Sequence, residues 1–447
     1  MMKSILLFVF IYLVSLSSCM ADINFDLSNL KLNTDLYNNN SSIQVKKEFF
    51  GVAPGGGNEA FSAYKYYSSL NEISPDVVRL EAITADYRNL YNPQTKLWDY
   101  SQLDNEIEKM SHGKRTIIAN IFYTPKFLSS CPDSKFYAFC TPNDLNAWSF
   151  YVTNIVQHVY QKYGIKYWEI GNEPSGKFFF KGSMSSFFKF YIETAKAIKK
   201  VDNNILVGGF ADNAFYVKAY SDFFTIIRKY DPNLLNFVTF HWYGDWGGGN
   251  GKYNPKDIFS ISEKLKETMD SSGFSGMPIF LTEWNLVGNN PPPWGGDQVA
   301  SYFVASEYWL QKSPIDKSLF FRVEPYNNTN ASLLDSNGKK NNVAEIFSIL
   351  SNIDTKNIYM QDNIYVFFNR TRREVVLSNY DLSDSSPKEV TLDIGKVDVS
   401  NCQKSKYKVV IYSNERMSNG VSNLKCSGEN AFINLVVKNF DVIHVSY

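Results

Sequence analysis

The sequence has no excess of charge of either sign, since 45 Lys and Arg residues balance 45 Asp and Glu residues. A chain without a net positive field lacks the usual electrostatic footprint for binding nucleic acid or anionic lipid. Histidine is also scarce: there are four, too widely separated for a metal-binding motif, namely His112, His158, His241 and His444. We therefore expect no nucleic-acid partner, no bound metal and no cofactor.

Two common catalytic motifs are missing as well. No Gly-x-Ser-x-Gly elbow of the serine hydrolases occurs. The glycine runs at 55–57 and 247–249 lack the lysine and the strand-to-helix context of a phosphate-binding loop. These absences argue against a serine hydrolase with a Gly-x-Ser-x-Gly elbow and against a nucleotide-binding protein with a phosphate-binding loop.

Long hydrophobic runs are absent too, so we expect no membrane span. The apolar run 5–16 follows Lys3 and precedes small residues ending at Ala21, which is the order of a secretory signal peptide. Residues 1–21 are therefore predicted to be removed, and the protein is predicted to be secreted or lysosomal. An uncleaved N-terminal anchor is the alternative.

Cysteine is scarce, and its number is informative. Cleavage after Ala21 would remove Cys19 and leave an even number, four, as in exported proteins with two disulfides. Three pairings are possible, and proximity in the sequence favours Cys131–Cys140 and Cys402–Cys426. Five glycosylation sequons are consistent with export: Asn39, Asn40, Asn327, Asn330 and Asn369.

Residues 48–353 alternate strand-like and helix-like segments, a pattern typical of a parallel sheet covered by helices. The candidate strands are 49–52, 77–80, 116–121, 167–171, 205–209, 237–241, 278–282 and 318–322. Eight such units close into a (β/α)8 TIM barrel. The helix before the fourth strand is expected to begin with Thr141, Pro142 and Asp144 as its cap and first turn, and to end at Gly164.

Residues 354–447 change to short runs of alternating hydrophobicity, which indicates an accessory antiparallel β-sandwich. The candidate strands are 364–368, 374–378, 388–392, 407–412, 432–437 and 442–447. The polar segment 22–47 is expected to precede the barrel, with the possibility of adding a strand to this sandwich.

Two glutamates follow short apolar runs that are predicted to be barrel strands. Glu173 lies in the sequence Asn-Glu-Pro, and Glu283 lies in Thr-Glu-Trp. Catalytic residues of such barrels lie at the C-terminal ends of the strands. Two carboxyl groups on one rim are what a retaining glycosidase uses, one as acid/base and one as nucleophile. We predict that Glu173 is the acid/base and Glu283 the nucleophile.

Five further residues are candidate substrate-binding or supporting groups. Asn172 could bond a sugar hydroxyl, typically the 2-OH, and Trp284 is an aromatic neighbour of the nucleophile. His241 and Tyr243, at the end of the sixth strand, could hydrogen-bond Glu283 and keep it ionised. Arg79 could lower the pKa of Glu283 by its charge. For Arg79, His241 and Tyr243, a purely structural role is the alternative.

The order of these motifs resembles that of glycoside hydrolase family 39, in the clan of retaining (β/α)8-barrel glycosidases. The matching segments are Val78-Arg79, Trp98-Asp99-Tyr100, Tyr123 to Leu128, Tyr163-Gly164-Ile165, Asn172-Glu173-Pro174, Val207-Gly208-Gly209, His241 with Tyr243, and Thr282 to Asn285. The family contains β-xylosidases and α-L-iduronidases. The resemblance implies the same two roles for Glu173 and Glu283, and a β-sandwich beside the barrel.

The chain departs from the family pattern at three positions. Gly171 stands where the family has a tryptophan, and Glu81 or its neighbour where it has a histidine. The eighth strand has Phe320-Phe321-Arg322 where an aromatic such as tryptophan is common. In the family these positions face the sugar.

We therefore predict a retaining glycoside hydrolase that cleaves terminal bonds of a xyloside or a uronic-acid glycoside. The alternatives are a heparanase-like or arabinofuranosidase-like glycosidase, a catalytically silent carbohydrate-binding barrel, and a cell-surface interaction protein. The oligomeric state stays open.

Overall fold

A computed structural model describes residues 22–26, 45–55, 67–111, 114–213, 217–246, 252–286, 297–325, 332–335, 337–353, 357–369, 372–396, 402, 405–413, 416–428 and 430–447. The predicted signal peptide, 1–21, and four of the five sequons lie outside these residues. The fifth, Asn369, has a fully buried side chain, so the folded chain has no room for a glycan there.

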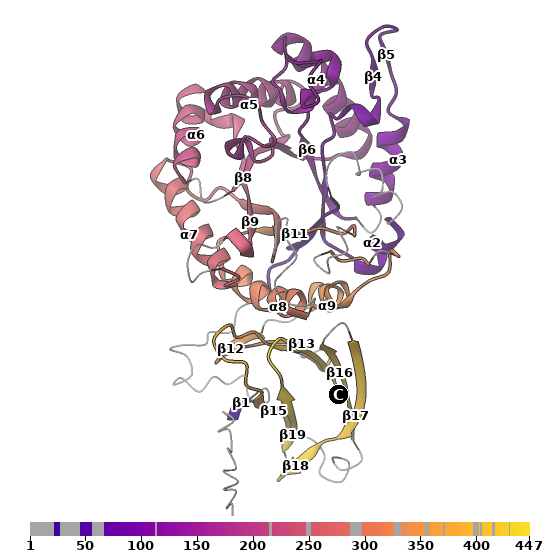
Figure 1. Cartoon of the computed structure of the whole chain (residues 1–447), viewed down its shortest axis with the longest axis vertical. Helices are drawn as coiled ribbons and strands as arrows, with labels where there is room; N and C mark the ends of the chain where they lie inside the picture. Colours follow the sequence, from indigo (N-terminus) through magenta and orange to yellow (C-terminus); the bar gives the residue numbers. More distant parts are fainter. Residues whose placement is uncertain are drawn as a thin grey trace, which may run out of the picture.

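A closed barrel of eight parallel strands forms the upper body of the molecule (Figure 1). In barrel order the strands are β10 (Ile279–Asn285), β11 (Lys317–Phe321), β2 (Phe50–Ala53), β3 (Val77–Leu80), β6 (Thr116–Ile121), β7 (Tyr167–Ile170), β8 (Leu206–Asn213) and β9 (Phe237–Tyr243). All eight correspond to predicted strands, with shifts at their ends. The prediction of a (β/α)8 barrel is confirmed.

Helices ring the barrel and follow its strands in turn (Figure 1). They are α2 (Tyr67–Ile73), α3 (Ser101–Met110), α4 (Leu145–Tyr163), α5 (Met184–Lys199), α6 (Val217–Tyr230), α7 (Lys256–Ser271), α8 (Asp297–Lys312) and α9 (Asn342–Ser351). A small hairpin of β4 (Tyr91–Asn92) and β5 (Leu97–Trp98) precedes α3.

Helix α4 begins later than the sequence pattern suggested. Asp144 is its N-cap, with a side chain that accepts hydrogen bonds from the backbone N–H groups of Asn146 and Ala147. Thr141 and Pro142 therefore precede the helix, because Asp144 rather than Thr141 satisfies the free N–H groups. The predicted end at Gly164 is confirmed, and its left-handed backbone (φ 68°) suits a residue without Cβ.

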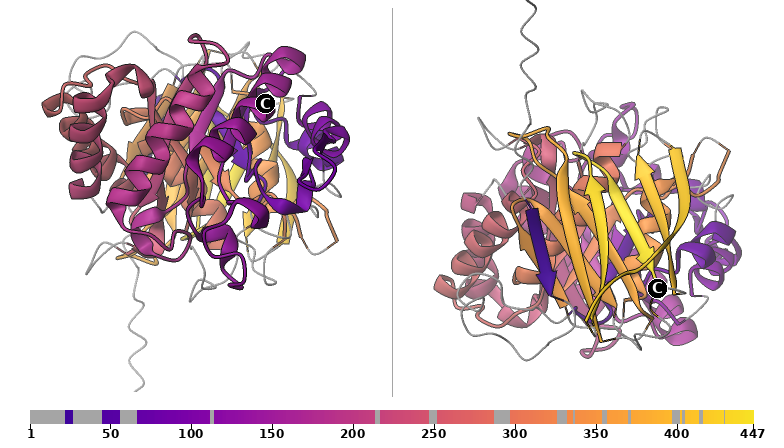
Figure 2. Two further views of the ribbon diagram at one scale, coloured as in Figure 1. Left: turned by 90° about the horizontal axis from the view of Figure 1, so that it is seen from above. Right: turned by 90° about the horizontal axis from the view of Figure 1, so that it is seen from below.

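Two accessory sheets lie below α8 and α9 (Figures 1 and 2). One has the order β12 (Asn357–Gln361), β13 (Ile364–Asn369), β14 (Glu374–Asn379), β20 (Val442–Ser446), β16 (Lys406–Ser413) and β17 (Arg416–Asn423). The other has the order β1 (Asp22–Asp26), β15 (Lys388–Lys396), β19 (Asn430–Val437) and β18 (Lys425–Ser427). The strands pair antiparallel except β1, which pairs parallel with β15 and lies at one edge.

A hydrophobic core that includes Val366, Leu377, Leu392 and Ile433 joins these sheets. The accessory sheets contact the barrel through α8, where Ser301 Oγ lies 2.7 Å from Ser378 Oγ. The predicted disulfides Cys131–Cys140 and Cys402–Cys426 are both present. The first closes the loop after β6, and the second joins the segment before β16 to β18.

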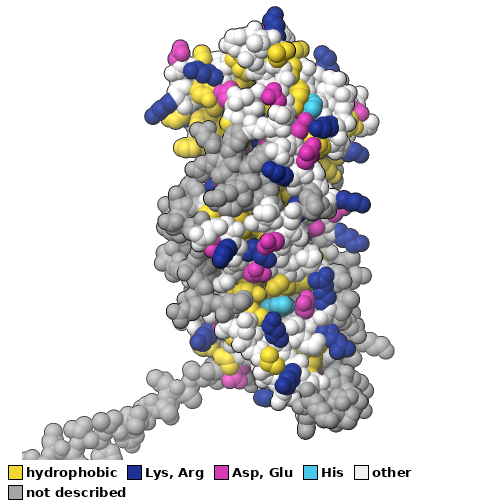
Figure 3. All heavy atoms as spheres, turned by 90° about the vertical axis from the view of Figure 1, so that its right-hand side faces the viewer, with side chains coloured by type: hydrophobic (Ala, Val, Ile, Leu, Met, Phe, Trp, Pro, Cys, Tyr) yellow, Lys and Arg dark blue, Asp and Glu magenta, His cyan; other side chains and the backbone are white. Residues whose placement is uncertain are grey.

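Charge is mixed over the described part of the face shown in Figure 3, where Lys and Arg side chains alternate with Asp and Glu. This agrees with the balanced composition. None of the helices that the structure describes is long and apolar enough to cross a membrane.

Candidate active site

Glu173 lies just beyond the C-terminal end of β7, where the chain turns sharply. Its backbone is left-handed (φ 43°), and its N–H donates to the carbonyl of Ala211 at 2.8 Å. Gly171 also has a positive φ, of 100°, and a Cβ there would lie 2.7 Å from the ring of Phe187. Asn120 supports the turn by donating from Nδ2 to the carbonyl of Gly171 at 2.9 Å. These contacts turn Glu173 into the barrel mouth.

Glu283 lies on β10 and is held by two donors. Arg79 Nη1 lies 2.5 Å from its Oε1, and the Tyr243 hydroxyl donates to its Oε2 at 2.8 Å. Burial alone would raise the pKa of Glu283, but His241, Arg79 and Tyr243 more than offset this and leave it below its usual value. Glu283 is thus kept ionised, as its predicted role of nucleophile requires.

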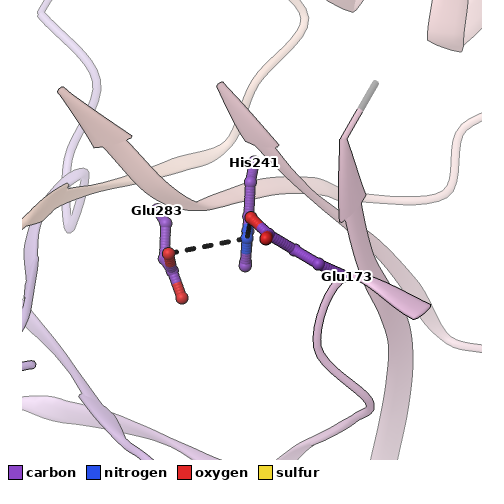
Figure 4. Close-up of side chains that lie close together, drawn as sticks. All are labelled: Glu173, His241 and Glu283. Atoms are coloured by element: carbon purple, nitrogen blue, oxygen red, sulfur yellow. Dashed lines mark hydrogen bonds and ion pairs between the residues drawn. The ribbon is translucent and has the colours of Figure 1, made fainter. Parts of the chain in front are cut away.

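His241 lies between the two glutamates. Its Nδ1 is 2.9 Å from Glu173 Oε1 and 3.6 Å from Glu283 Oε2. Figure 4 shows both carboxyl groups beside the imidazole ring. Burial would lower the pKa of His241, but the charges of Glu283 and Glu173 raise it instead. One ligand atom from each of the three residues lies within 4.8 Å of the others.

This trio could offer ligands to a cation, yet the charge of Arg79 argues against one. Its guanidinium group already contacts Glu283 and is itself fully buried. A second cation at the same carboxylate would face that charge with little solvent screening. The donor set therefore fits an acid–nucleophile pair better than a metal centre.

Glu169 is a supporting residue that the sequence reading did not assign. It lies on β7, is 0 % exposed, and accepts from Arg79 Nε at 2.7 Å, from Asn120 at 2.9 Å and from Thr282 at 2.7 Å. Because its two oxygens take three donors, Glu169 fixes the guanidinium group that in turn contacts Glu283. A charged residue within the apolar run of a predicted strand was the available signal.

Glu81 is a second unassigned acid, in the same pocket. Its Oε1 is 3.5 Å from Arg79 Nη1, and its buried Oε2 has no hydrogen-bond partner among the described residues. Burial, opposed by Arg79, raises the pKa of Glu81 to about 8. Glu81 is at or next to the position where the family pattern has a histidine, so the sequence had already pointed to this part of the chain.

Of the two remaining predicted residues, Asn172 lines the pocket and Trp284 does not. The Oδ1 atom of Asn172 accepts from Arg79 Nη2 at 3.1 Å, which leaves its amide N–H groups for a ligand. Trp284 is fully buried and stacks on Phe303, with ring centroids 5.6 Å apart. Successive residues of a strand point to opposite sides, so the residue after Glu283 faces the helices. Trp284 is therefore a core residue, and the prediction that it contacts the substrate is wrong.

The site opens into a cavity of about 1090 Å³. Its lining combines Arg79, Glu81, Asn172, Glu173, Tyr243 and Glu283 at the base with aromatic side chains from the loops after β6 and β7. Such a volume is at the upper end of small-molecule sites.

Residues 66–310 match the sequence pattern of Glycosyl hydrolases family 39 over more than half of the chain. The chain belongs to this family. Two proteins are similar in sequence: a β-xylosidase of Caldicellulosiruptor saccharolyticus, 28 % identical over 165 residues, and a β-xylosidase of Geobacillus stearothermophilus, 27 % identical over 184 residues. The alignments span 34 % and 36 % of this chain and 32 % and 36 % of those proteins, so about a third of each relative is matched.

Solved structures share the fold over nearly the whole chain. A monomeric β-xylosidase from Caulobacter crescentus has a TM-score of 0.70 at 17 % identity and covers 95 % of this chain and 98 % of its own. A glucosidase from Croceicoccus marinus has the same TM-score and identity, with 96 % and 99 % covered. A barrel with accessory sheets is thus a fold that this chain shares with a β-xylosidase and a glucosidase.

Proposed function

We propose that this family 39 protein is a retaining glycoside hydrolase. The observation that carries the proposal is the pair Glu173 and Glu283, with carboxylate oxygens within 4.8 Å at one end of the barrel. Retaining enzymes have carboxyl groups roughly 5–5.5 Å apart, whereas inverting enzymes leave room for a water.

In the proposed reaction Glu283 attacks the anomeric carbon while the bond to the leaving oxygen breaks. Glu173 transfers its proton to that oxygen, which gives a covalent glycosyl-enzyme and a free alcohol. Glu173 then takes a proton from water, the resulting hydroxide attacks the anomeric carbon, and Glu283 departs as a carboxylate. Arg79 and Tyr243 stabilise the charge of Glu283 before and after the covalent stage.

For the substrate we propose a β-xyloside. The named sequence relatives are β-xylosidases, and this supports the neutral sugar over a uronic acid. Asn172 is proposed to bond the sugar's 2-OH, since its amide group lies in the pocket beside Arg79 and Glu173.

The two roles are tested with an activated aryl β-xyloside and the variants Glu173→Ala and Glu283→Ala. Glu173→Ala should still form the glycosyl-enzyme and then stall, and azide should speed its release as the glycosyl azide of retained configuration. Glu283→Ala should lose activity on good and poor leaving groups alike. Glu345→Ala, which removes a partly exposed carboxyl group on α9, is the control.

If azide instead yields the retained product with Glu283→Ala and does nothing for Glu173→Ala, the two roles are exchanged. If the wild-type protein hydrolyses no member of a panel of aryl β-xyloside, β-glucoside, β-glucuronide, α-L-iduronide and α-L-arabinofuranoside, the proposal of hydrolase activity fails.

We also propose that the chain is exported after cleavage behind Ala21, to the cell exterior or the lysosome. The two disulfides support an oxidising compartment. Sequencing the N-terminus of the mature protein should give Asp22 as its first residue, and a chain retaining Met1 would contradict the proposal.

A further inference from the structure

Five aromatic rings from the loops after β6 and β7 line the cavity together. We call this set the aromatic wall: Phe122, Tyr123, Phe139, Phe178 and Phe179, all of which line the pocket. Neighbouring rings are in contact, with centroids 4.1 Å apart for Phe122–Tyr123 and 4.8 Å for Phe178–Phe179. Phe139 lies 5.8 Å from Phe179 and 6.4 Å from Phe178, and so joins the two loops.

The wall presents apolar surface to solvent at the pocket mouth. Phe178 is 66 % exposed, although Phe180, two residues later, is buried. An exposed phenylalanine costs free energy in the unbound protein, and a cluster of such rings within a pocket marks a binding surface.

The wall is also rigidly attached. Phe139 precedes Cys140, which is bonded to Cys131, and its carbonyl accepts from the N–H of Lys181 at 2.9 Å. The carbonyl of Ala138 accepts from the N–H of Thr124 at 2.9 Å. The first bond ties the loop after β6 to the loop after β7 and the second braces the loop after β6, so the backbone that carries the rings is held in place before a ligand arrives.

The place of the wall in the chain shows which of the two glutamates it lies beside. Phe178 and Phe179 follow Glu173 in the same loop, after the single turn Pro174–Gly176. Glu283 comes instead from β10, on another part of the barrel. Phe139 packs against Phe178 and Phe179, so these three rings of the wall lie beside the loop of the acid, where the leaving group departs.

We propose that the aromatic wall is a leaving-group subsite that takes an apolar aglycone, alkyl or aryl, rather than a second sugar. This inference rests on the proposed function, because it takes Glu173 as the acid. A cavity of about 1090 Å³ leaves space beyond a single sugar ring for such a group. The wall itself supplies few polar atoms to replace the water that a second sugar would lose.

The test compares methyl and hexyl glycosides of the sugar and anomeric configuration that the aryl panel selects, or β-xylosides if the panel selects none. The two leaving groups have nearly the same chemistry, so the hexyl-to-methyl ratio of kcat/KM measures apolar binding. We expect the wild-type ratio to exceed about tenfold, and Phe178→Ala to lower it by about fivefold or more. Phe150→Ala is the matched control: Phe150 is 57 % exposed on α4 and does not line the pocket.

Dissociation constants of the same glycosides for Glu173→Gln, measured by calorimetry, give a second readout that needs no turnover. A wild-type ratio near one, or a ratio unchanged in Phe178→Ala, overturns the subsite. Loss of xylobiose hydrolysis in Phe178→Ala with an unchanged alkyl ratio assigns the wall to a second sugar and also overturns it. Hydrolysis of no glycoside at all refutes the proposed function, and the dissociation constants then decide whether the wall binds apolar groups.

Discussion

The guanidinium group of Arg79 lies 2.5 Å from the carboxylate of Glu283, and both groups are buried. The same guanidinium donates to Glu169 and Asn172, so one planar side chain joins the barrel interior to the catalytic rim. A buried carboxylate would otherwise be pushed toward its neutral form. This pairing is the physical reason why we propose Glu283 rather than Glu173 as the nucleophile.

Arg79→Lys tests this pairing. Lysine keeps the charge but cannot bond three partners in fixed directions, so we expect kcat/KM to fall by on the order of a hundredfold. Without the close hydrogen bond from the guanidinium group, the pKa of Glu283 should rise, and the acidic limb of the pH profile should move to higher pH. The control is Arg115→Lys, remote from the pocket. An unmoved acidic limb would show that Arg79 does not set the charge of Glu283.

Gly171→Ala tests the turn that presents Glu173. Gly171 has φ 100°, and a Cβ would lie 2.7 Å from Phe187 and 3.2 Å from the carbonyl of Phe210. We expect unfolding free energy to drop by about 1–3 kcal/mol and kcat to fall with it, because Glu173 must shift. Gly176→Ala is the matched control, since its Cβ would meet nothing within 4 Å. Equal urea midpoints and equal kcat for the two variants would contradict this account.

The eight barrel strands could be predicted from the sequence because a parallel strand buried on both faces consists of a short apolar run. Glu173 and Glu283 stood out because each follows such a run. The strands β12, β17 and β18 were missed: β17 and β18 are rich in Ser, Asn, Lys and Arg, and lack the alternation that marks a half-buried strand.

The residues around Glu173 and Glu283 could not be predicted in the same way. Trp284 was misassigned because the sequence places it beside Glu283, whereas the strand turns the two side chains to opposite faces. Glu169 contacts Arg79 from a strand 90 residues further along the chain, and this contact follows from barrel closure and register rather than from any local pattern. Glu81 lies only two residues after Arg79, but its burial in the pocket depends on the folded barrel.

Removing the two disulfides separately should give different results. The bond Cys131–Cys140 closes the loop that carries Phe139, whereas Cys402–Cys426 lies among the accessory sheets. Replacing either pair with serine should lower stability, typically by about 2–4 kcal/mol. Only the first replacement should also raise KM for glycosides with apolar leaving groups. Thermal unfolding and steady-state kinetics measure the two effects, and equal KM values for both double variants would contradict the role of the first bond.

The last prediction concerns the pH dependence of stability. Burial raises the pKa of Glu307, on α8, to about 8, an effect that Gln311 and Lys46 partly oppose. The folded chain therefore keeps a proton that the unfolded chain releases at an ordinary carboxyl pKa near 4.5. Its stabilising contribution is complete below about pH 4.5 and is lost as pH rises to about 8, by on the order of 1 kcal/mol per pH unit.

Glu307→Gln should remove this contribution, so the decline in unfolding free energy between pH 5 and pH 8 should be shallower in the variant than in the wild type. Urea denaturation at the two pH values measures the difference. Glu72→Gln, at an exposed position on α2, should leave the slope unchanged. Glu81, with its pKa also raised to about 8 by burial, contributes a decline of the same sign that persists in both variants. A wild-type protein more stable at pH 8 than at pH 5, together with an unchanged slope in Glu307→Gln, would show that Glu307 is ionised in the folded state.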